Sequence, residues 1–429
     1  APYCFIDESL PKKRILSMIN QCKPKIFFLS KIKFLKYKGL KIISNNLKKY
    51  YSLKFKSIGY FSKIMPSTPA YIMFTSGSTG IPKGVIINHE NLLNFIYWIR
   101  KNYKFSKLDT LTNINPLYFD NAVFDIYATF FSGSTLAPLD LDPINPEKTI
   151  EILKLVKCTS WFSVPSLLIY LYAINLIQRK NFKYLKKIIF GGEGYPKAQL
   201  KSFFDLYCSR IDFYNVYGPS ECTCICSSYK INKNDFKDLK GLPNLGKIIG
   251  LFDFLLIDKK NRVVKDKGEL CLIGPNVGLG YFNDQDQTKK SFIQNPLNKR
   301  FIDIIYKTGD VVLIDKNSNL KFANRIDNQI KHLGYRIELD EIVHALHLVS
   351  GITEAYVFQH YLNDISTIIA VVSTNSSIKF NEKKIKQDLK NKIPNYMIPY
   401  KILFENFLPK NANGKINGSK IKLNYKKIL

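Results

Sequence analysis

The feature that most restricts the fold is an alternation of short apolar segments with helical ones between residues 161 and 216. Apolar runs at residues 161–164, 188–190 and 213–216 have the length of buried strands. The intervening segments, at residues 167–176 and 197–206, have the length and spacing of helices. Strands that alternate with helices along a chain form a mostly parallel sheet covered by helices.

The pattern changes after about residue 241, where short strands separated by turns replace the alternation and predict a β-rich subdomain at residues 241–326. Residues 327–429 carry helices and strands of their own, including a helical pattern at residues 339–348. We therefore expect an α/β fold with two domains. Residues 1–326 would form a large N-terminal domain of helix-covered, mostly parallel sheets with a small β subdomain, and residues 327–429 a compact C-terminal α+β domain.

A loop rich in glycine and hydroxyl side chains follows the apolar run at residues 71–74. It reads TSGSTGIPKG (residues 75–84). Its bare backbone N–H groups and hydroxyls can surround phosphate oxygens, and Lys83 adds a positive charge. It is not the Walker pattern, because no Gly-Lys-Ser/Thr opens a helix here. An ordinary polar turn has the same composition, so the loop alone leaves both interpretations open.

The chain is strongly basic, with 64 Lys and Arg residues against 34 Asp and Glu residues and a formal net charge of +30. Such a balance is common in proteins that bind nucleic acid or anionic membranes. The basic residues are scattered through every segment, however, which favours a solvated surface and argues against a nucleic-acid partner. No apolar run is long enough to span a bilayer.

Eight cysteines are present without the paired framework of small secreted proteins, which predicts reduced thiols in a cytoplasmic protein. Cys222, Cys224 and Cys226 alternate with other residues, so on a strand they would share one face. A structural zinc site needs four ligands at wider spacing, so pocket lining or core packing is the favoured interpretation. His89 and His332 have no second ligand nearby in the sequence and are interpreted as structural.

Further motifs follow the loop. NVYGPSE (residues 215–221) offers a tyrosine face that can stack on a purine, next to a hydroxyl and a carboxylate that can hold Mg²⁺ at a phosphate. YKTGD (residues 306–310) places a carboxylate after a turn, where it can accept both hydroxyls of a ribose. The later motifs are NRIDNQIK (324–331), GYRIEL (334–339), PNYMIP (394–399) and LPKNANGK (408–415).

In this order and at this spacing, the motifs resemble those of the adenylate-forming enzymes. The resemblance is to the amino-acid adenylation domains of nonribosomal peptide synthetases and the stand-alone D-alanine to carrier-protein ligases, and it covers nearly the whole chain as far as Lys415. It implies that ATP and Mg²⁺ are the cofactors and that the products are an aminoacyl adenylate and pyrophosphate. A mobile C-terminal domain would then allow transfer to the phosphopantetheine arm of a separate carrier protein.

The resemblance also assigns roles to matching positions. ATP would be bound by Thr75, Ser76, Gly77, Ser78, Thr79, Gly80, Lys83, Tyr217, Asp310 and Arg325. Catalytic roles would fall to Ser220, Glu221, which would hold Mg²⁺, and the mobile Lys415. Cations are needed there because a substrate carboxylate must approach a polyanionic phosphate. Asp327 would be the hinge, and Gly334 would border the pantetheine channel.

The amino acid itself would pair its ammonium group with Asp120. Local sequence alone predicts a helix cap at Asp120, but the family register favours the ammonium partner. The other pocket positions would be Asn121, Phe124, Ser163, Ile189, Gly191, Val216, Cys224 and Ile225. None of these is charged, which predicts a small or medium, uncharged amino acid. D-alanine is one candidate, although Gly191 stands where the D-alanine ligases carry a cysteine, which predicts a roomier pocket.

Some alternatives stay open. The family's first N-terminal segment has no counterpart before Ala1, so part of the family domain is expected to be missing, and an inactive relative that only binds nucleotide is one possibility. A carboxylic acid to coenzyme A ligase is another, separable by whether Asp120 is needed. A basic nucleic-acid-binding protein is a third, which salt-sensitive binding without nucleotide chemistry would reveal.

Overall fold

The structure of the chain is a computed structural model. It describes residues 1–29, 41–44, 64–77, 80–139, 145–178, 180–248, 250–362, 365–374, 381–411 and 413–425. Ser78 and Thr79 of the predicted phosphate loop lie outside these described residues.

A seven-stranded sheet with the order β11-β10-β9-β8-β7-β5-β6 forms the centre of the large domain. Its strands are β5 (Thr110–Asn113), β6 (Thr135–Pro138), β7 (Ser160–Ser163), β8 (Lys187–Gly191), β9 (Asp212–Tyr217), β10 (Ser227–Lys230) and β11 (Lys247–Ile248). The strands from β5 to β9 pair in parallel, whereas β10 and β11 pair antiparallel at one edge. The predicted mostly parallel sheet is therefore confirmed.

Helices bury both faces of this sheet. The helices are α3 (His89–Tyr103), α4 (Asn121–Ser132), α5 (Pro146–Leu155), α6 (Pro165–Ala173) and α7 (Lys197–Tyr207). Trp161, Ile188 and Phe190 pack into one core with α5, α6 and α7, whereas Phe162 and Ile189 pack into a second core with α3 and α4. Because successive side chains of a strand point to opposite faces, neighbouring residues serve different cores.

The predicted phosphate loop joins two antiparallel strands beside the central sheet. These strands are β3 (Pro69–Thr75) and β4 (Lys83–Asn88), and β15 (Gly280–Tyr281) adds a third strand on the other side of β4. Thr75 and Lys83 are register partners at the mouth of the loop. At the other end of β4, the Asn88 side chain accepts a hydrogen bond from the Asn91 amide at 2.7 Å and caps α3.

The N-terminal residues form α1 (Lys12–Cys22) and the parallel pair β1 (Ile26–Leu29) and β2 (Lys41–Ser44). The β-rich part of the large domain is a six-stranded sheet in which neighbouring strands are antiparallel. Its strands are β12 (Asp253–Ile257), β13 (Val263–Val264), β14 (Lys267–Ile273), β16 (Phe292–Gln294), β17 (Ile304–Ile314) and β18 (Leu320–Arg325), with α8 (Gln285–Ser291) before β16. Short 3₁₀ helices are η2 (Ser220–Cys222) and η3 (Lys233–Lys237).

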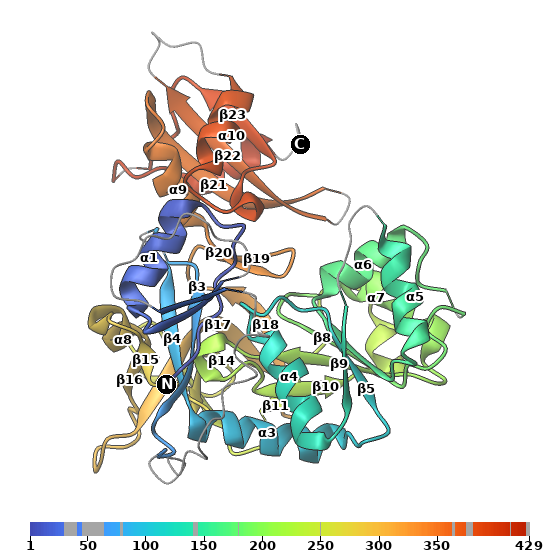
Figure 1. The fold of residues 1–429 in the computed structure, drawn as a ribbon. Coiled ribbons are helices and arrows are strands. Elements are labelled where there is room, and N and C mark those ends of the chain that lie inside the picture. Colours follow the sequence, from blue (N-terminus) through green and yellow to red (C-terminus); the bar gives the residue numbers. More distant parts are fainter. Residues whose placement is uncertain are drawn as a thin grey trace.

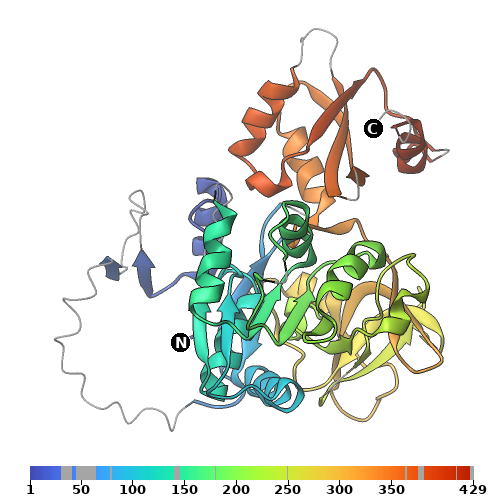
Figure 2. The same cartoon turned by 90° about the vertical axis from the view of Figure 1, so that its right-hand side faces the viewer.

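The smaller C-terminal domain stands on the large domain in both ribbon views (Figure 1, Figure 2). It begins with a hairpin, β19 (Gln329–His332) and β20 (Tyr335–Glu338), that lies between the two domains (Figure 1). The remaining elements are α9 (Leu339–His347), β21 (Ile352–Leu362), β22 (Ile365–Thr374), α10 (Glu382–Lys390), η4 (Asn395–Met397), β23 (Lys401–Glu405) and α11 (Gly418–Tyr425). The large domain and smaller α+β domain confirm the predicted fold class.

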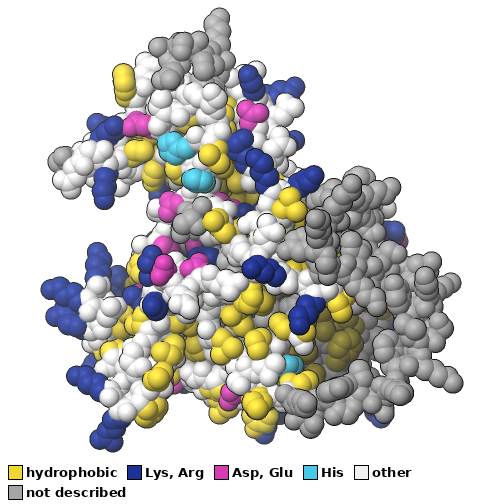
Figure 3. Space-filling view, turned by 60° about the vertical axis from the view of Figure 1, so that its left-hand side comes forward, with side chains coloured by type: hydrophobic (Ala, Val, Ile, Leu, Met, Phe, Trp, Pro, Cys, Tyr) yellow, Lys and Arg dark blue, Asp and Glu magenta, His cyan; other side chains and the backbone are white. Residues whose placement is uncertain are grey.

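Charged side chains lie at the junction of the two domains. Figure 3 shows acidic and histidine side chains gathered there, and Lys and Arg side chains lie beside them as well as over other parts of this face. Within the described residues, no helix has both the length and the apolar character needed to cross a membrane.

Candidate active site

A cavity of about 860 Å³ lies where the hairpin β19–β20 meets the carboxyl ends of the central strands. In parallel sheets this edge is the usual place for a ligand site. The predicted site residues that line it are Thr75, Ser76, Asp120, Asn121, Ser163, Tyr217, Ser220, Asp310, Arg325 and Gly334. A second cavity of about 750 Å³ shares Tyr217, Asp310 and Arg325 with the first and adds Val216. The structure therefore brings together residues that are far apart in the sequence.

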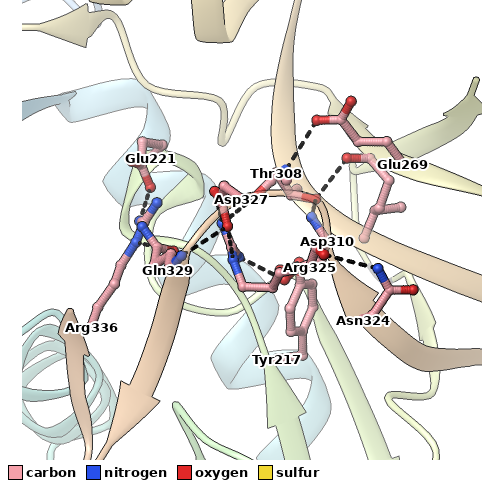
Figure 4. Close-up of polar contacts among 12 residues, drawn as sticks. Tyr217, Glu221, Glu269, Thr308, Asp310, Asn324, Arg325, Asp327, Gln329 and Arg336 are labelled. Atoms are coloured by element: carbon pink, nitrogen blue, oxygen red, sulfur yellow. Dashed lines mark hydrogen bonds and ion pairs between the residues drawn. The ribbon is translucent and has the colours of Figure 1, made fainter. Parts of the chain in front are cut away.

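Asp310, the predicted ribose partner, accepts hydrogen bonds from two other predicted ATP-site residues (Figure 4). The Tyr217 hydroxyl donates to its Oδ2 atom at 2.6 Å, and the Arg325 guanidinium donates to its Oδ1 atom at 2.6 Å. Arg325 also donates to the predicted hinge residue Asp327 at 2.6 and 2.7 Å. The end of β18 is thereby tied to β17 and to the start of the C-terminal domain.

Asp120 stands before α4 but makes no cap hydrogen bond with its side chain. Its carboxylate accepts a hydrogen bond from the Ser220 hydroxyl at 2.5 Å instead. Burial raises the pKa of Asp120, and Ser220 and Lys331 oppose that shift. Asp120 is therefore a cavity-lining carboxylate whose surroundings disfavour its charge, and a cationic ligand group would restore the balance.

Glu221 is fully buried in η2, and both of its oxygens have partners. The Arg336 guanidinium donates to Oε2 at 2.7 Å, and the Tyr281 hydroxyl donates to Oε1 at 2.7 Å. Burial alone would raise the pKa of Glu221, but the charge of Arg336 outweighs it and lowers the pKa to about 2. Figure 4 shows Arg336 reaching Glu221 from the hairpin strand β20.

The described residues of the phosphate loop face the C-terminal domain. The Ser76 hydroxyl donates to the backbone carbonyl of Arg336 at 2.7 Å. The Lys83 ammonium lies 3.3 Å from the Glu338 carboxylate. Gly80 has a positive φ of 80°, and a Cβ there would lie 3.2 Å from the His344 ring of α9. The loop is thus in direct contact with the hairpin and with α9.

Lys331 also enters the site from β19, although no role was assigned to it in the motif at residues 324–331. It lines both cavities, and its Nζ atom lies 5.6 Å from the centroid of the Tyr217 ring. Burial lowers the pKa of Lys331, and Asp310 opposes that shift. The hairpin therefore brings Lys331 and Arg336 among the carboxylates of the large domain.

The predicted amino-acid pocket is only partly open. Phe124, Ile189, Cys224 and Ile225 are buried in the core and line neither cavity. The expectation of a roomier pocket at Gly191 is wrong, because a Cβ there would lie 2.4 Å from the Val216 carbonyl oxygen and 2.6 Å from its Cγ2 atom. The strand pairing of Gly191 with Val216 fills that space.

The three closely spaced cysteines do not share a strand face, which corrects the sequence expectation. Cys222 belongs to η2, and Cys224 has a positive φ of 73° in the turn that follows. All three thiols are buried in the core beside α3 and α4. Among the described residues there is no group of three His, Cys, Asp or Glu side chains that could hold a metal ion. His332 contacts the Ser366 hydroxyl through Nδ1 at 2.9 Å.

The structure separates the two C-terminal residues to which the resemblance gives roles. Gly334 forms the tip of the hairpin and lines the first cavity, and its amide donates to Glu193 at 3.0 Å. Lys415 is exposed and lines neither cavity. Its backbone amide donates to the Asn411 side chain at 3.0 Å within a turn of the C-terminal domain.

Several residues of the site carried no assigned role in the sequence. Arg336, Lys331 and Glu338 lie within quoted motifs, so their charged character was a signal. Arg14 pairs with Glu341, and Tyr281 donates to Glu221. These partners are far apart in the chain, and no local pattern marks them.

Comparisons with known proteins identify the family. A sequence model described as AMP-binding enzyme matches residues 1–282, and one described as AMP-binding enzyme C-terminal domain matches residues 341–415. D-alanine–D-alanyl carrier protein ligase of Staphylococcus aureus is 32% identical over 427 residues, which cover 98% of this chain and 84% of that protein. Bacitracin synthase 3 of Bacillus licheniformis is 29% identical over 97% of this chain, although the match spans only 6% of the synthase.

Solved structures share the fold. One is a holo nonribosomal peptide synthetase protein containing adenylation and PCP domains, with a TM-score of 0.83 and 21% identity over 99% of this chain and 71% of that one. Another is the Vibrio cholerae adenylation domain AlmE in complex with glycyl-adenosine-5'-phosphate, with a TM-score of 0.82 and 19% identity over 98% of this chain and 83% of that one. Since one family model covers residues 1–282, the chain belongs to the AMP-binding enzymes, the adenylate-forming family whose motifs its sequence resembles.

Proposed function

We propose that the chain activates an amino acid with ATP to form an aminoacyl adenylate and then passes the aminoacyl group to the phosphopantetheine thiol of a separate carrier protein. The observation that carries this proposal is the position of Asp120. It is a cavity-lining carboxylate that accepts a hydrogen bond from Ser220, the neighbour of Glu221. An amino acid bound there by its ammonium group would have its own carboxylate near the residues predicted to serve the α-phosphate.

In the first half-reaction, an oxygen of the substrate carboxylate attacks the α-phosphorus of ATP. A new P–O bond forms, and the bond to pyrophosphate breaks. Tyr217 would stack on the adenine, Asp310 would accept the ribose hydroxyls beside Arg325, and the loop at residues 75–84 would hold the departing pyrophosphate. Lys415 would bring positive charge to the reacting oxygens.

Ser220 and Glu221 suit the Mg²⁺ that the family resemblance implies. Hard cations prefer carboxylate and hydroxyl oxygens. Glu221 is fully buried, and a buried carboxylate is costly without a cation beside it. Arg336 is that cation in this structure, so Glu221 would need another when Arg336 moves away. When bound, Mg²⁺ would neutralise charge on the phosphates.

The arrangement of the domains suits the second half-reaction. There the pantetheine sulfur attacks the acyl carbon, a C–S bond forms, the bond to AMP breaks, and the thiol gives up its proton. Gly334 lines the cavity, whereas Lys415 lies outside it. A swing of residues 327–429 about Asp327, relative to residues 1–326, would exchange the two.

The pocket favours a small amino acid. Asn121 and Ser163 line the cavity beside Asp120, but Val216 fills the space next to Gly191. A substrate side chain that reached Gly191 would meet this packed wall, which favours a short side chain. Glycine and either enantiomer of alanine are therefore the preferred candidates. All eight cysteines are free, in keeping with the cytoplasm as the proposed place of action.

Amino-acid-dependent exchange of labelled pyrophosphate into ATP tests the proposal across L- and D-amino acids. We expect exchange with glycine or alanine and its loss in Asp120→Asn, which keeps the shape of the side chain but removes the charge. Asp205→Asn is the matched control, because Asp205 pairs with Lys201 on the exposed face of α7. Absence of exchange with every amino acid from cooperatively folded protein would overturn the proposal.

A further inference from the structure

The C-terminal domain places an acidic side chain on the lysine of the phosphate loop. Glu338, at the end of β20, lies 3.3 Å from the Nζ atom of Lys83, and the two side chains are only 8% and 10% exposed. The Glu338 carboxylate also accepts a hydrogen bond from the Gln329 amide at 2.8 Å. The loop lysine is therefore held by a nearly buried anion that comes from the other domain.

Two other phosphate-binding groups of the loop have partners from the same domain. The backbone N–H of Gly77 faces the Glu341 carboxylate in the first turn of α9 and opposes the rise that burial causes in the pKa of Glu341. Arg14 pairs with the same carboxylate. The Ser76 hydroxyl donates to the Arg336 carbonyl oxygen at 2.7 Å. The ammonium and the hydroxyl, two kinds of group that such a loop offers to phosphate oxygens, thus each contact an oxygen of the C-terminal domain, and the Gly77 amide faces a carboxylate of the same domain.

The same hairpin supplies the opposite charge to the predicted metal ligand. The Arg336 guanidinium donates to Glu221 at 2.7 Å and to Gln329 at 2.8 Å. Glu221 is fully buried, whereas 21% of the Arg336 side chain is exposed. Removal of Arg336 would leave a buried carboxylate without its cation, which is strongly unfavourable unless another cation takes its place.

We propose that the docked C-terminal domain is a protein substitute for magnesium pyrophosphate. Glu338 pairs with the loop lysine and Glu341 faces the loop, where the β- and γ-phosphates would lie, and Arg336 takes the position of the cation at Glu221. This inference rests on the proposed function, in which the loop holds pyrophosphate. In this inference, Arg336, Glu338 and Glu341 are positioning residues that link the departure of pyrophosphate to the docking of the hairpin.

The consequence is that the docked orientation and bound pyrophosphate exclude each other. A ligand that binds only the undocked protein has an apparent affinity reduced by the fraction of protein that is undocked. Mutations that weaken docking should therefore strengthen pyrophosphate binding, although they remove no contact that pyrophosphate makes. If the docked domain instead left the loop free for pyrophosphate, the loss of an ion pair between the domains would not change pyrophosphate affinity.

Calorimetric titration of the full chain with magnesium pyrophosphate, without amino acid, tests the inference. Glu338→Gln should lower the dissociation constant by about fivefold or more, which is the lower end of usual coupling between linked sites. Glu354→Gln is the matched control, because Glu354 pairs with Lys410 within the C-terminal domain at 2.7 Å. An unchanged or weaker affinity in Glu338→Gln, with the control at the wild-type value, would overturn the inference.

Hydrogen exchange gives a second measurement that requires no variant. The Gly334 amide donates to Glu193 across the domain junction, so undocking removes its acceptor. Magnesium pyrophosphate should therefore speed exchange of the amide protons in residues 329–338 of the wild-type chain. Unchanged exchange under saturating pyrophosphate would show that the docked hairpin and the ligand coexist, contrary to the inference.

The two proposals fail in different ways. If pyrophosphate binds but Glu338→Gln has no effect, the inference fails while amino-acid-dependent exchange can still take place. If Glu338→Gln binds pyrophosphate more tightly but no amino acid supports exchange, the proposed substrate class fails. The inference that the docked domain and magnesium pyrophosphate exclude each other then still stands.

Discussion

Two tips of the C-terminal domain carry cationic side chains, and the structure places them in opposite surroundings. The hairpin β19–β20 inserts Lys331 and Arg336 among the carboxylates of the large domain. The turn at residues 408–416 holds Lys415 exposed, outside both cavities. Since both tips belong to one domain, that domain can present two sets of charges to one site, but only in different orientations. Each tip should therefore serve a different half-reaction.

Removal of the exposed lysine should produce the largest change. Lys415→Ala should slow amino-acid-dependent pyrophosphate exchange by about 10²- to 10³-fold, the usual cost of losing one preorganised charge-stabilising group. Transfer from a preformed aminoacyl adenylate to a pantetheine thiol should stay near the wild-type rate. Pyrophosphate exchange at the wild-type rate in Lys415→Ala would refute the role of this lysine. Loss of both adenylation and thiol transfer would contradict the assignment of a different half-reaction to each tip.

Substitution at the hairpin tip should have the reverse pattern. Gly334 has a positive φ of 81°, and a Cβ there would lie 2.8 Å from Val164. Gly334→Leu should slow thiol transfer by about 10²-fold, because small displacements at a reacting centre are costly, while pyrophosphate exchange persists.

Gly133→Leu is the matched control for backbone strain. Gly133 also has a positive φ, of 69°, but no atom lies within 4 Å of a Cβ placed there. The rates of adenylation and of thiol transfer, measured separately in both variants, distinguish backbone strain from obstruction at the hairpin. A slow transfer step in Gly133→Leu as well would show that strain, and not obstruction at the hairpin, causes the defect.

Much of the fold could be predicted because local patterns determine it. Ile188, Ile189 and Phe190 alternate between two cores, and such an apolar run indicates a strand with both faces buried. Asn88 caps α3 with its short polar side chain, which stands directly before the first residue of the helix. Tyr217, Glu221 and Asp310 of the site lie in sequence motifs. The order of these motifs along the chain indicated their roles.

The parts of the fold and the site that could not be predicted depend on contacts between residues far apart in the chain, which no local pattern encodes. The chain leaves β9 at Tyr217 and turns through η2, so Cys222 and Cys224 do not continue a strand. Gly191 opens no space because its strand partner Val216 fills it. The cation at Glu221 comes from Arg336, 115 residues away in the chain. Which tip of the C-terminal domain faces the site is a property of domain packing.

The smallest expected effect concerns the pH dependence of docking. Asp310, Arg325, Arg336 and Asp120 all face Lys331 in the docked orientation, and burial lowers its pKa from the usual value of about 10.5. A lysine whose pKa is lowered on docking releases its proton more readily in the docked state. Docking should therefore become more favourable as the pH rises from this lowered pKa toward 10.5.

Calorimetry can measure this linkage through the competition between docking and magnesium pyrophosphate. As the pH is raised toward 10.5, the wild-type chain should lose pyrophosphate affinity relative to Lys331→Met, which cannot titrate at this position. The ratio of the two affinities removes the titration of pyrophosphate itself, because both proteins meet the same ligand. A ratio that stays constant over this range would show that Lys331 keeps its charge in the docked state.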